Sequence, residues 1–189
     1  MISGQDIELI VVGGSSGSIP VLMQIINSLP DDFKVPVVLI IHRMKNVESE
    51  LKTLLSSTKK IIEPEDKEPI RQGCVYLAPQ NYHLLIEDNK TFSLDYSELV
   101  NYSRPSIDVT FMSASEVYKK QTMGILLSGA NKDGAEGINT IIKNGGCGIV
   151  QDPASAGCPI MPESAIEINN AVNILNPAAI ISMILATMK

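Results

Sequence analysis

The chain has 189 residues, of which 44% are hydrophobic and 19% charged, a balance typical of one folded domain rather than a disordered segment. A net charge of −6, an aromatic content of 4% and the absence of Trp argue against a nucleic-acid-binding surface. Three cysteines and two histidines fit neither a disulfide framework nor a zinc cluster. We therefore expect a single domain over residues 1–189 with reduced thiols, in the cytoplasm, without a signal peptide and without membrane insertion.

Strand-like and helix-like segments alternate along most of the chain. Runs of aliphatic and β-branched residues predict buried strands at residues 8–12, 35–41, 60–63, 122–127, 147–150 and 171–175. Apolar residues at helical spacing predict helices at residues 19–29, 48–57, 106–120, 134–144, 162–169 and 177–188. This alternation is typical of a doubly wound, mostly parallel sheet with helices on both faces.

The middle of the chain departs from this alternation. Short strand-like segments at residues 73–78, 82–86 and 91–94 follow one another with only short connections between them. Such connections suit an antiparallel hairpin or meander. The predicted fold class is therefore α/β, with an antiparallel hairpin inserted into the parallel arrangement.

Three chemically active residues each follow a predicted parallel strand. Ser15 follows the first strand within Gly13-Gly-Ser-Ser-Gly-Ser18, His42 follows the second, and Asp133 lies in the turn after the strand that ends at residue 127. Because parallel strands end at one edge of a sheet, we expect these residues to converge there. Serine, histidine and aspartate are the nucleophile, the general base and the group that orients the base in serine hydrolases.

The chemistry explains why these residue types would be grouped. An imidazole with a pKa near ~6.5 can take the proton of a serine hydroxyl and return it to the leaving group, and backbone amides of the glycine-serine turn would hold the oxyanion. Each residue alone also permits a plainer interpretation. Ser15 could begin a helix, His42 could be structural, and Asp133 could cap the next helix, since Asp133-Gly-Ala-Glu136 has capping-box spacing.

A glycine-rich loop after the first strand is also a feature of dinucleotide-binding proteins. Two residues argue against that interpretation: Ser18 stands where a close-packing glycine is required, and His42 stands where an acidic residue would bind the ribose. No tyrosine is followed by a lysine four residues later. An NAD(P)-binding oxidoreductase is therefore kept as an alternative, beside a binding or regulatory module that has the fold without the activity.

Several segments spread over nearly the whole chain form a specific pattern when taken together. They include Gly-x-Val-Tyr-x-Ala-Pro-x-x-x-His-Leu at residues 73–84, Arg-Pro-Ser-x-Asp at 104–108 and Gln-Asp-x-x-Ser at 151–155. The others are the loop at 13–18 and the segments at 41–44, 129–135 and 161–165. In this order they resemble the catalytic domain of the CheB family, the chemoreceptor glutamate methylesterases.

The resemblance implies a serine esterase that hydrolyses γ-glutamyl methyl esters of chemoreceptors with release of methanol, and that in many members deamidates receptor glutamines. It implies no metal and no organic cofactor, and its partner would be the cytoplasmic domain of a methylated receptor. It assigns Ser15 as the nucleophile, His42 as the base and Asp133 as the orienting acid. The oxyanion and substrate-binding residues implied by the resemblance are Ser16, Gly17, Ala130 and Met161.

The chain departs from the family pattern in several places. Few residues precede the first predicted strand, so we expect no receiver domain in this chain, and a separate receiver protein stays open as a regulator. Ile41 replaces the glutamine before the histidine, Ala130 replaces the methionine of a Gly-Met-Gly turn, and Ser18 replaces a glycine. These departures bear on efficiency and substrate more than on the class of reaction.

Overall fold

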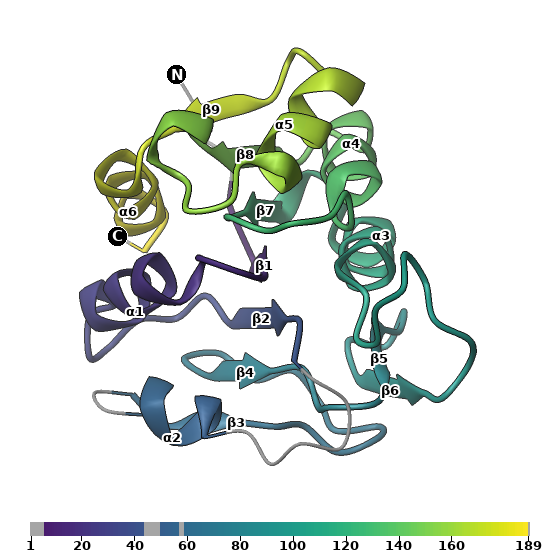
Figure 1. Ribbon diagram of the computed structural model, residues 1–189. Coiled ribbons are helices and arrows are strands. Elements are labelled where there is room, and N and C mark those ends of the chain that lie inside the picture. Colours follow the sequence, from purple (N-terminus) through teal and green to yellow (C-terminus); the bar gives the residue numbers. More distant parts are fainter. Residues whose placement is uncertain (1–5, 44–49, 57–58, 189) are drawn as a thin grey trace.

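The computed structural model describes residues 6–43, 50–56 and 59–188. In this part of the chain a seven-stranded parallel sheet forms the centre of the molecule (Figure 1). Its strands in spatial order are β3 (Ile61–Ile62), β4 (Val75–Leu77), β2 (Val37–Ile41), β1 (Leu9–Gly14), β7 (Thr122–Leu126), β8 (Cys147–Gln151) and β9 (Asn173–Leu175). β5 (His83–Ile86) and β6 (Phe92–Asp95) form a separate antiparallel hairpin. The predicted fold class is confirmed.

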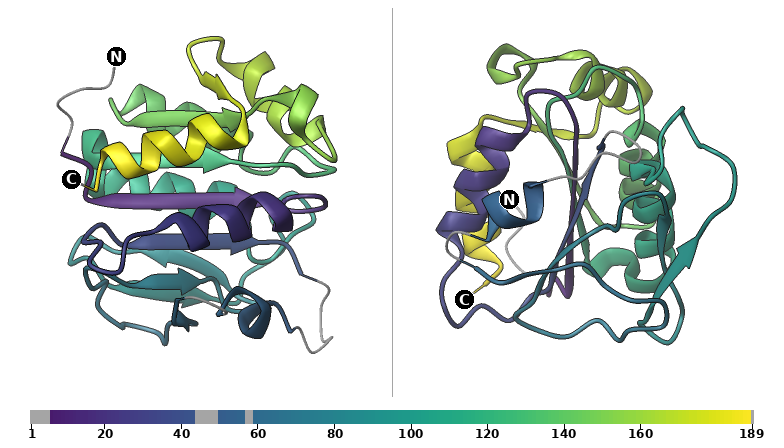
Figure 2. Two further views of the ribbon diagram at one scale, coloured as in Figure 1. Left: turned by 90° about the vertical axis from the view of Figure 1, so that its left-hand side faces the viewer. Right: turned by 60° about the horizontal axis from the view of Figure 1, so that its bottom comes forward.

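Helices cover both faces of the sheet, as the views in Figures 1 and 2 show. One face packs against α1 (Ile19–Ser28), α2 (Leu51–Leu55) and α6 (Pro177–Ala186). The other packs against α3 (Ile107–Tyr118), α4 (Ala135–Lys143) and α5 (Ile160–Ile168). The short 3₁₀ helices η1 (Lys119–Gln121) and η2 (Pro153–Ser155) complete the helical segments of the described residues.

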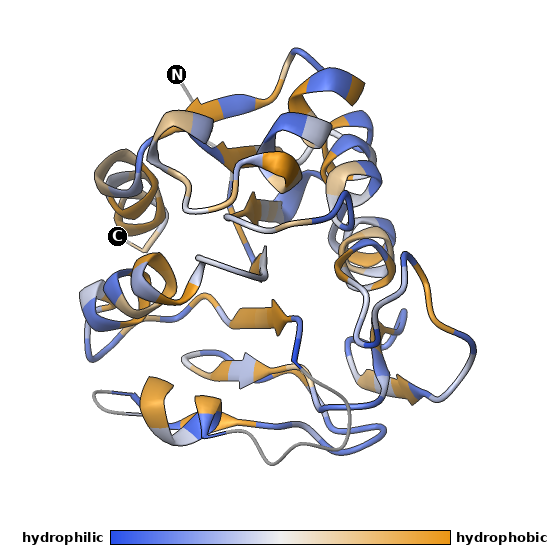
Figure 3. Cartoon of the chain, viewed as in Figure 1, coloured by the Kyte–Doolittle hydropathy of each residue, from blue (hydrophilic) through white to orange (hydrophobic). Residues whose placement is uncertain are grey.

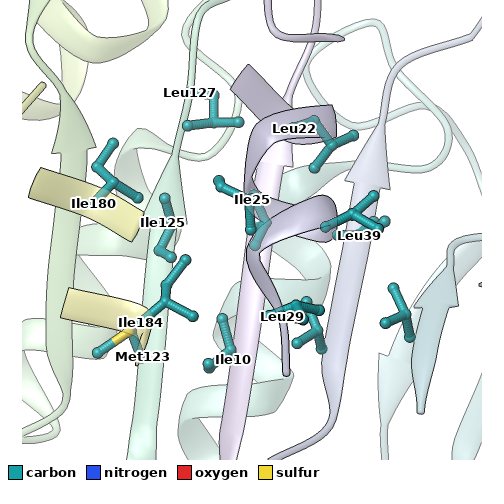
Figure 4. Close-up of a cluster of buried hydrophobic side chains, with 14 of the residues drawn as sticks. Ile10, Leu22, Ile25, Leu29, Leu39, Met123, Ile125, Leu127, Ile180 and Ile184 are labelled. Carbon is teal, nitrogen blue, oxygen red and sulfur yellow. The ribbon is translucent and has the colours of Figure 1, made fainter. Parts of the chain in front are cut away.

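Successive strand residues enter two different cores, one on each side of the sheet. Ile10 and Val12 of β1 join α1 and α6 in the first core, part of which is drawn in Figure 4. Leu9 and Val11 face the opposite way and join α3 and α4. Burial of both faces explains why strands such as β1 and β2 consist of continuous apolar runs, and β2 is orange in Figure 3.

The order of the strands indicates where in the sheet a binding site is expected. The chain proceeds from β1 to one side of the sheet through β2, then returns to pair β7 with the other edge of β1. A topological switch point therefore lies beside β1. In open parallel sheets of this type, ligands bind in the crevice at the carboxyl ends of the strands that flank the switch point.

Some sequence-based expectations need correction. The sequence predicts that residues 73–78 belong to the hairpin or meander, which is wrong: β4 pairs in parallel with both β2 and β3 and is buried throughout. Of the helix expected at 48–57, the structure describes α2, while residues 48, 49 and 57 lie outside the described part, as does Met44 of the 41–44 segment. α5 begins two residues before the expected start, because Pro162 is tolerated within its first turn.

Candidate active site

The loop after β1 is held between the strands on either side of it. The β1 residue Gly14 pairs with Ile41 of β2, and its carbonyl accepts a hydrogen bond from the His42 backbone N–H at 3.2 Å. The Ser15 backbone N–H donates to the carbonyl of Ser128, beyond β7, at 2.9 Å. Ser15 therefore stands at the switch point, directly next to the strand that carries His42.

A tight turn shapes the residues from Ser15 to Ser18. The backbone N–H and the hydroxyl of Ser18 both donate to the Ser15 carbonyl, at 3.1 and 2.7 Å. Gly17 has a φ of +83°, and a Cβ added there would lie 2.7 Å from the Ser128 Oγ, so only glycine fits this turn without strain. Ser18, which stands in a family glycine position, is thus a buried side chain that closes the turn.

The buried residue Ser128 ties this turn to the loop before α5. Its hydroxyl donates to the Ser16 carbonyl at 2.8 Å and accepts from the Cys158 backbone N–H at 2.8 Å. The Gly129 N–H donates in turn to the Cys158 carbonyl at 3.0 Å. Ser128 was not singled out from the sequence, since a serine beside a glycine reads there as an ordinary turn residue.

His42 and Asp133 meet although 91 residues separate them in the chain. The His42 Nε2 lies 2.8 Å from the Asp133 Oδ2. The Asp133 side chain is fully buried, and that of His42 is 12% exposed. Two of the residues that were expected to converge are therefore in direct contact at the carboxyl edge of the sheet.

The Asp133 carboxylate accepts five hydrogen bonds. Its donors are the His42 Nε2, the Ser106 hydroxyl, the backbone N–H groups of Ile107 and Asp108, and the Asn101 amide. Burial raises the pKa of this carboxyl, but the hydrogen bonds, that from His42 first, outweigh it and hold the pKa below its ordinary value. The ionised carboxylate can only accept, so the proton of a neutral His42 is on Nε2 and its Nδ1 presents a lone pair.

Ser15 and His42 are adjacent but not joined. Among the hydrogen bonds of the described residues, none links the Ser15 hydroxyl to the His42 ring. The group nearest to the His42 Nδ1 among these bonds is the Ser103 hydroxyl, at the long distance of 3.4 Å. Nδ1 is the ring atom with a free lone pair, so it is the atom that a serine hydroxyl would have to approach in a Ser–His–Asp arrangement. Apo hydrogen bonds of this type are often long or absent.

The other expected site residues fall into two groups. Ser16, Gly17 and Ala130 are exposed, and the N–H groups of Ser16 and Gly17 have no hydrogen-bond partner among the described residues. Two such N–H groups beside a nucleophile can receive an oxyanion. Met161, in contrast, is fully buried and packs beneath Gly129, so its side chain supports the loop from below.

A second buried carboxylate, that of Asp108, supports the site through contacts with the start of α4. Its Oδ1 accepts from the backbone N–H groups of Gly134 and Gly137 at 2.9 and 2.7 Å, at the start of α4. Asp133, directly before α4, accepts from the first N–H groups of α3. The two helices therefore exchange their capping carboxylates, each favourably placed at a helix N-terminus. The Asn101 amide donates to both, at 2.8 Å to Asp108 and 3.2 Å to Asp133.

This exchange corrects one interpretation of Asp133. The capping-box spacing suggested that Asp133 caps its own following helix, but the N-cap of α4 is Gly134, with no side-chain cap. Asp133 instead caps α3, a helix that lies before it in the sequence. Asp108, which lies in α3, acts in the same way across the interface, at the start of α4. Asn101 left no sequence signal beyond that of a turn residue.

Asp108→Asn should change how stability depends on pH. Burial, helped by the charge of Asp133, raises the pKa of the Asp108 carboxyl to about 6. Between about pH 4 and 6 the folded protein thus holds a proton that the unfolded chain has released, so this group weakens folding as pH rises. The variant has no titrating group at this position, so its unfolding free energy does not fall in this way. The difference in unfolding free energy, variant minus wild type, should therefore increase by up to about 1.4 kcal/mol per pH unit across that window.

Urea unfolding from pH 4.5 to 7.5 measures this difference. At pH 4.5 the variant should be the less stable protein, because its new amide N–H₂ faces the Asn101 amide, which also donates. Asp88→Asn, which removes an exposed carboxylate, is the control and should keep the wild-type dependence. A wild-type slope in Asp108→Asn would show that Asp108 does not titrate in this range.

Two hollows of the structure differ in size and in the residues that line them. A small one of about 70 Å³ adjoins the site and is lined by His42, Arg43, Tyr102, Ser103, Arg104 and Pro105. A larger one of about 360 Å³ lies at the amino ends of the strands, around residues such as Glu8 and Lys34, away from the chemistry. No group of three or more metal-ligating side chains is found in the described residues, and no helix there has the length and apolarity of a membrane span.

A parallel α/β domain with a serine loop and a His–Asp pair at its switch point has the architecture of a serine hydrolase domain. The comparison with protein families is specific about which one. The CheB methylesterase family matches residues 10–184, so the chain belongs to this family.

Relatives and a solved structure agree with this assignment. A Leptospira interrogans protein whose name includes protein-glutamate methylesterase/protein-glutamine glutaminase is 47% identical over 171 residues, 89% of each chain. A Thermotoga maritima protein of the same name is 35% identical over 165 residues, and this chain spans about half of its length, 48%. The crystal structure of the Thermotoga maritima CheB methylesterase catalytic domain superposes with a TM-score of 0.88 at 33% identity, over 95% of this chain and 97% of that one.

Proposed function

We propose that this chain is a protein-glutamate methylesterase with protein-glutamine glutaminase activity, acting on the cytoplasmic part of a chemoreceptor. The observation that carries the proposal is the 2.8 Å contact of the His42 Nε2 with a buried, ionised Asp133, next to the Ser15 loop. The names of the relatives support the reaction, and they support neither an oxidoreductase nor an inactive binding module.

The proposed reaction begins with attack of the Ser15 oxygen on the γ-carbonyl carbon of the glutamyl ester. The His42 Nδ1 accepts the serine proton, while Asp133 holds the ring through Nε2 and stabilises the imidazolium. The N–H groups of Ser16 and Gly17 stabilise the oxyanion. The tetrahedral intermediate then breaks its bond to the methoxy oxygen, which takes the proton from Nδ1 and leaves as methanol.

Water completes the cycle. His42 Nδ1 removes a proton from a water molecule, whose oxygen attacks the acyl-enzyme carbonyl, and the proton returns to the Ser15 oxygen as that bond breaks. The products are a free glutamate side chain and the original enzyme. A glutamine substrate follows the same path and releases ammonia in place of methanol, since both reactions share one acyl-enzyme.

Methanol release from a methylated receptor fragment tests the proposal. Catalytic amounts of the protein should liberate methanol from the methylated cytoplasmic fragment of a receptor of the same cell, and ammonia from its glutamine form. A serine-directed fluorophosphonate should label Ser15, and His42→Ala should abolish the labelling. Absence of both, with a rise in melting temperature on adding NAD(P), would favour the oxidoreductase; no response at all would favour a binding module.

A further inference from the structure

Large hydrophobic side chains are exposed at several places in the described part of the chain, and more than half of them fall in one segment. Leu54, Ile168 and Ile174 are exposed at scattered positions, and Ile160 is exposed at the start of α5. The remaining five share a short stretch of the chain, and we call them the rim patch: Tyr82, Tyr96, Leu99, Val100 and Tyr102. Single exposed apolar residues are ordinary, whereas a group of them marks an interaction surface.

The rim patch is continuous with the site. The rings of Tyr82 and Tyr96 lie 5.6 Å apart, and the Arg104 guanidinium stacks on Tyr96 at 3.9 Å from its centroid. Arg104 and Tyr102 then line the same hollow as His42. In Figure 3 the connection between β6 and α3 stands out from the body of the domain and includes an orange stretch. An apolar surface thus leads from the hairpin to the catalytic edge.

The connection that carries the patch is fixed to the site. Val100 and Ser103 exchange backbone hydrogen bonds at 3.3 and 2.9 Å, which close a turn. Within it Asn101 and Tyr102 have φ values of +49° and +62°, in the left-handed region, which asparagine adopts readily and a bulky residue such as tyrosine rarely does. The Asn101 side chain is held by Asp108 and Asp133. The same carboxylate that orients His42 therefore positions this turn, which presents a Tyr102 that is 97% exposed.

The reaction places the substrate backbone against this surface. In a glutamyl ester, only three carbon–carbon bonds of about 1.5 Å each separate the backbone Cα from the carbonyl carbon. For attack at about 3 Å, that Cα must come within about 7 Å of the Ser15 oxygen. The net charge of −6 offers no long-range attraction for an acidic polypeptide. Binding of such a substrate therefore relies on local contacts at the rim.

We propose that the rim patch binds the segment of the substrate polypeptide that flanks the esterified glutamate, through apolar side chains of that segment. The occupant is the substrate itself because the patch reaches the wall of the hollow beside His42 and is held by the triad acid. Tyrosine is among the residues that contribute most to protein interfaces. The proposal rests on the proposed function and names how that site selects a protein.

The double variant Tyr82→Ser/Leu99→Ser tests it, since neither residue lines the hollow beside His42. Its KM for the methylated receptor fragment should rise at least about tenfold, with kcat unchanged. Its kcat/KM for N-acetyl-glutamate γ-methyl ester N′-methylamide, which is too small to extend from the hollow to Tyr82 and Leu99, should stay within about twofold of the wild type. The control Ile168→Ser/Ile174→Ser removes two side chains of similar exposure elsewhere and should leave KM and kcat unchanged for both substrates.

The outcomes separate the two proposals. An unchanged KM for the protein substrate, or an equal loss on both substrates at an unchanged melting temperature, overturns the docking role. Sedimentation showing a wild-type dimer that the double variant abolishes assigns the patch to a second copy and also overturns it. If the variant unfolds, the single variant Leu99→Gln, which replaces one apolar side chain of the patch by a polar one of similar size, supplies the same comparison. Failure of the wild type to hydrolyse either ester overturns the proposed function instead.

Discussion

Ser15→Ala is expected to lower kcat for methyl-ester hydrolysis by about 10⁶-fold, leaving only the acceleration that binding and the oxyanion donors provide. The variant lacks the oxygen that would form the acyl-enzyme, and its neighbour in the turn cannot replace it. The Ser15 hydroxyl makes no hydrogen bond among the described residues, and its backbone N–H and carbonyl keep their partners, Ser128 and Ser18. We therefore expect the melting temperature to change by no more than a few degrees.

Steady-state methanol release and fluorophosphonate labelling measure this loss, and calorimetry measures the stability. Ser16→Ala is the matched control, because Ser16 lies in the same turn, is exposed, and contributes its backbone rather than its hydroxyl to the contacts with Ser128. The control should retain most of the activity and should still be labelled. If Ser15→Ala keeps its activity while Ser16→Ala loses it, the nucleophile has been assigned to the wrong residue.

The parts of the fold that the sequence predicts are those in which one local pattern determines the outcome. The apolar run that forms β1 is buried on both faces, so a continuous hydrophobic stretch reports it directly. The helical spacing of apolar residues in α1 gives that helix in the same way. β4 was misplaced because three residues carry little periodicity, and its neighbours β2 and β3 are distant in sequence. Its pairing depends on tertiary contacts.

The same distinction holds for the site: the meeting of His42 and Asp133 is predicted from the sequence, whereas the contacts that support them are not. Residues that follow parallel strands meet at one edge of the sheet, and His42 and Asp133 are in contact for this reason. The contacts that hold this pair in place cannot be predicted from the topology. Asp108 acts on the backbone of α4, 26 residues away, and Asn101 acts through a left-handed turn that no periodic pattern encodes. Ser18 shows the converse case, where a departure from the family pattern is accommodated by one local hydrogen bond to Ser15.

Asp133→Asn is expected to lower kcat by about 10⁴-fold, because it reverses the tautomer of His42. Both carboxylate oxygens of Asp133 now accept: Oδ2 from His42 and Ile107, and Oδ1 from Ser106, Asp108 and Asn101. An asparagine must turn its N–H₂ toward one of these sets. If it faces His42, the ring can only accept at Nε2 and carries its proton on Nδ1, where it cannot take the serine proton.

The opposite orientation of the Asn side chain at position 133 would also lower the stability of the folded protein. If the N–H₂ faces the other set, the Ser106 hydroxyl and the Asp108 N–H at the start of α3 lose their acceptor, while the Asn101 amide keeps only Asp108. Leaving a buried donor unpaired costs about 1–3 kcal/mol. We therefore expect the amide to face His42, with a loss of stability of about 1–3 kcal/mol from the unpaired Ile107 N–H and the lost charge. Methanol-release kinetics measure the rate, and nitrogen NMR of the imidazole reports the tautomer. Asp88→Asn, which removes an exposed carboxylate in the turn between β5 and β6, is the control. An Asp133→Asn variant with near-wild-type kcat and an unchanged tautomer would remove Asp133 from the proposed mechanism.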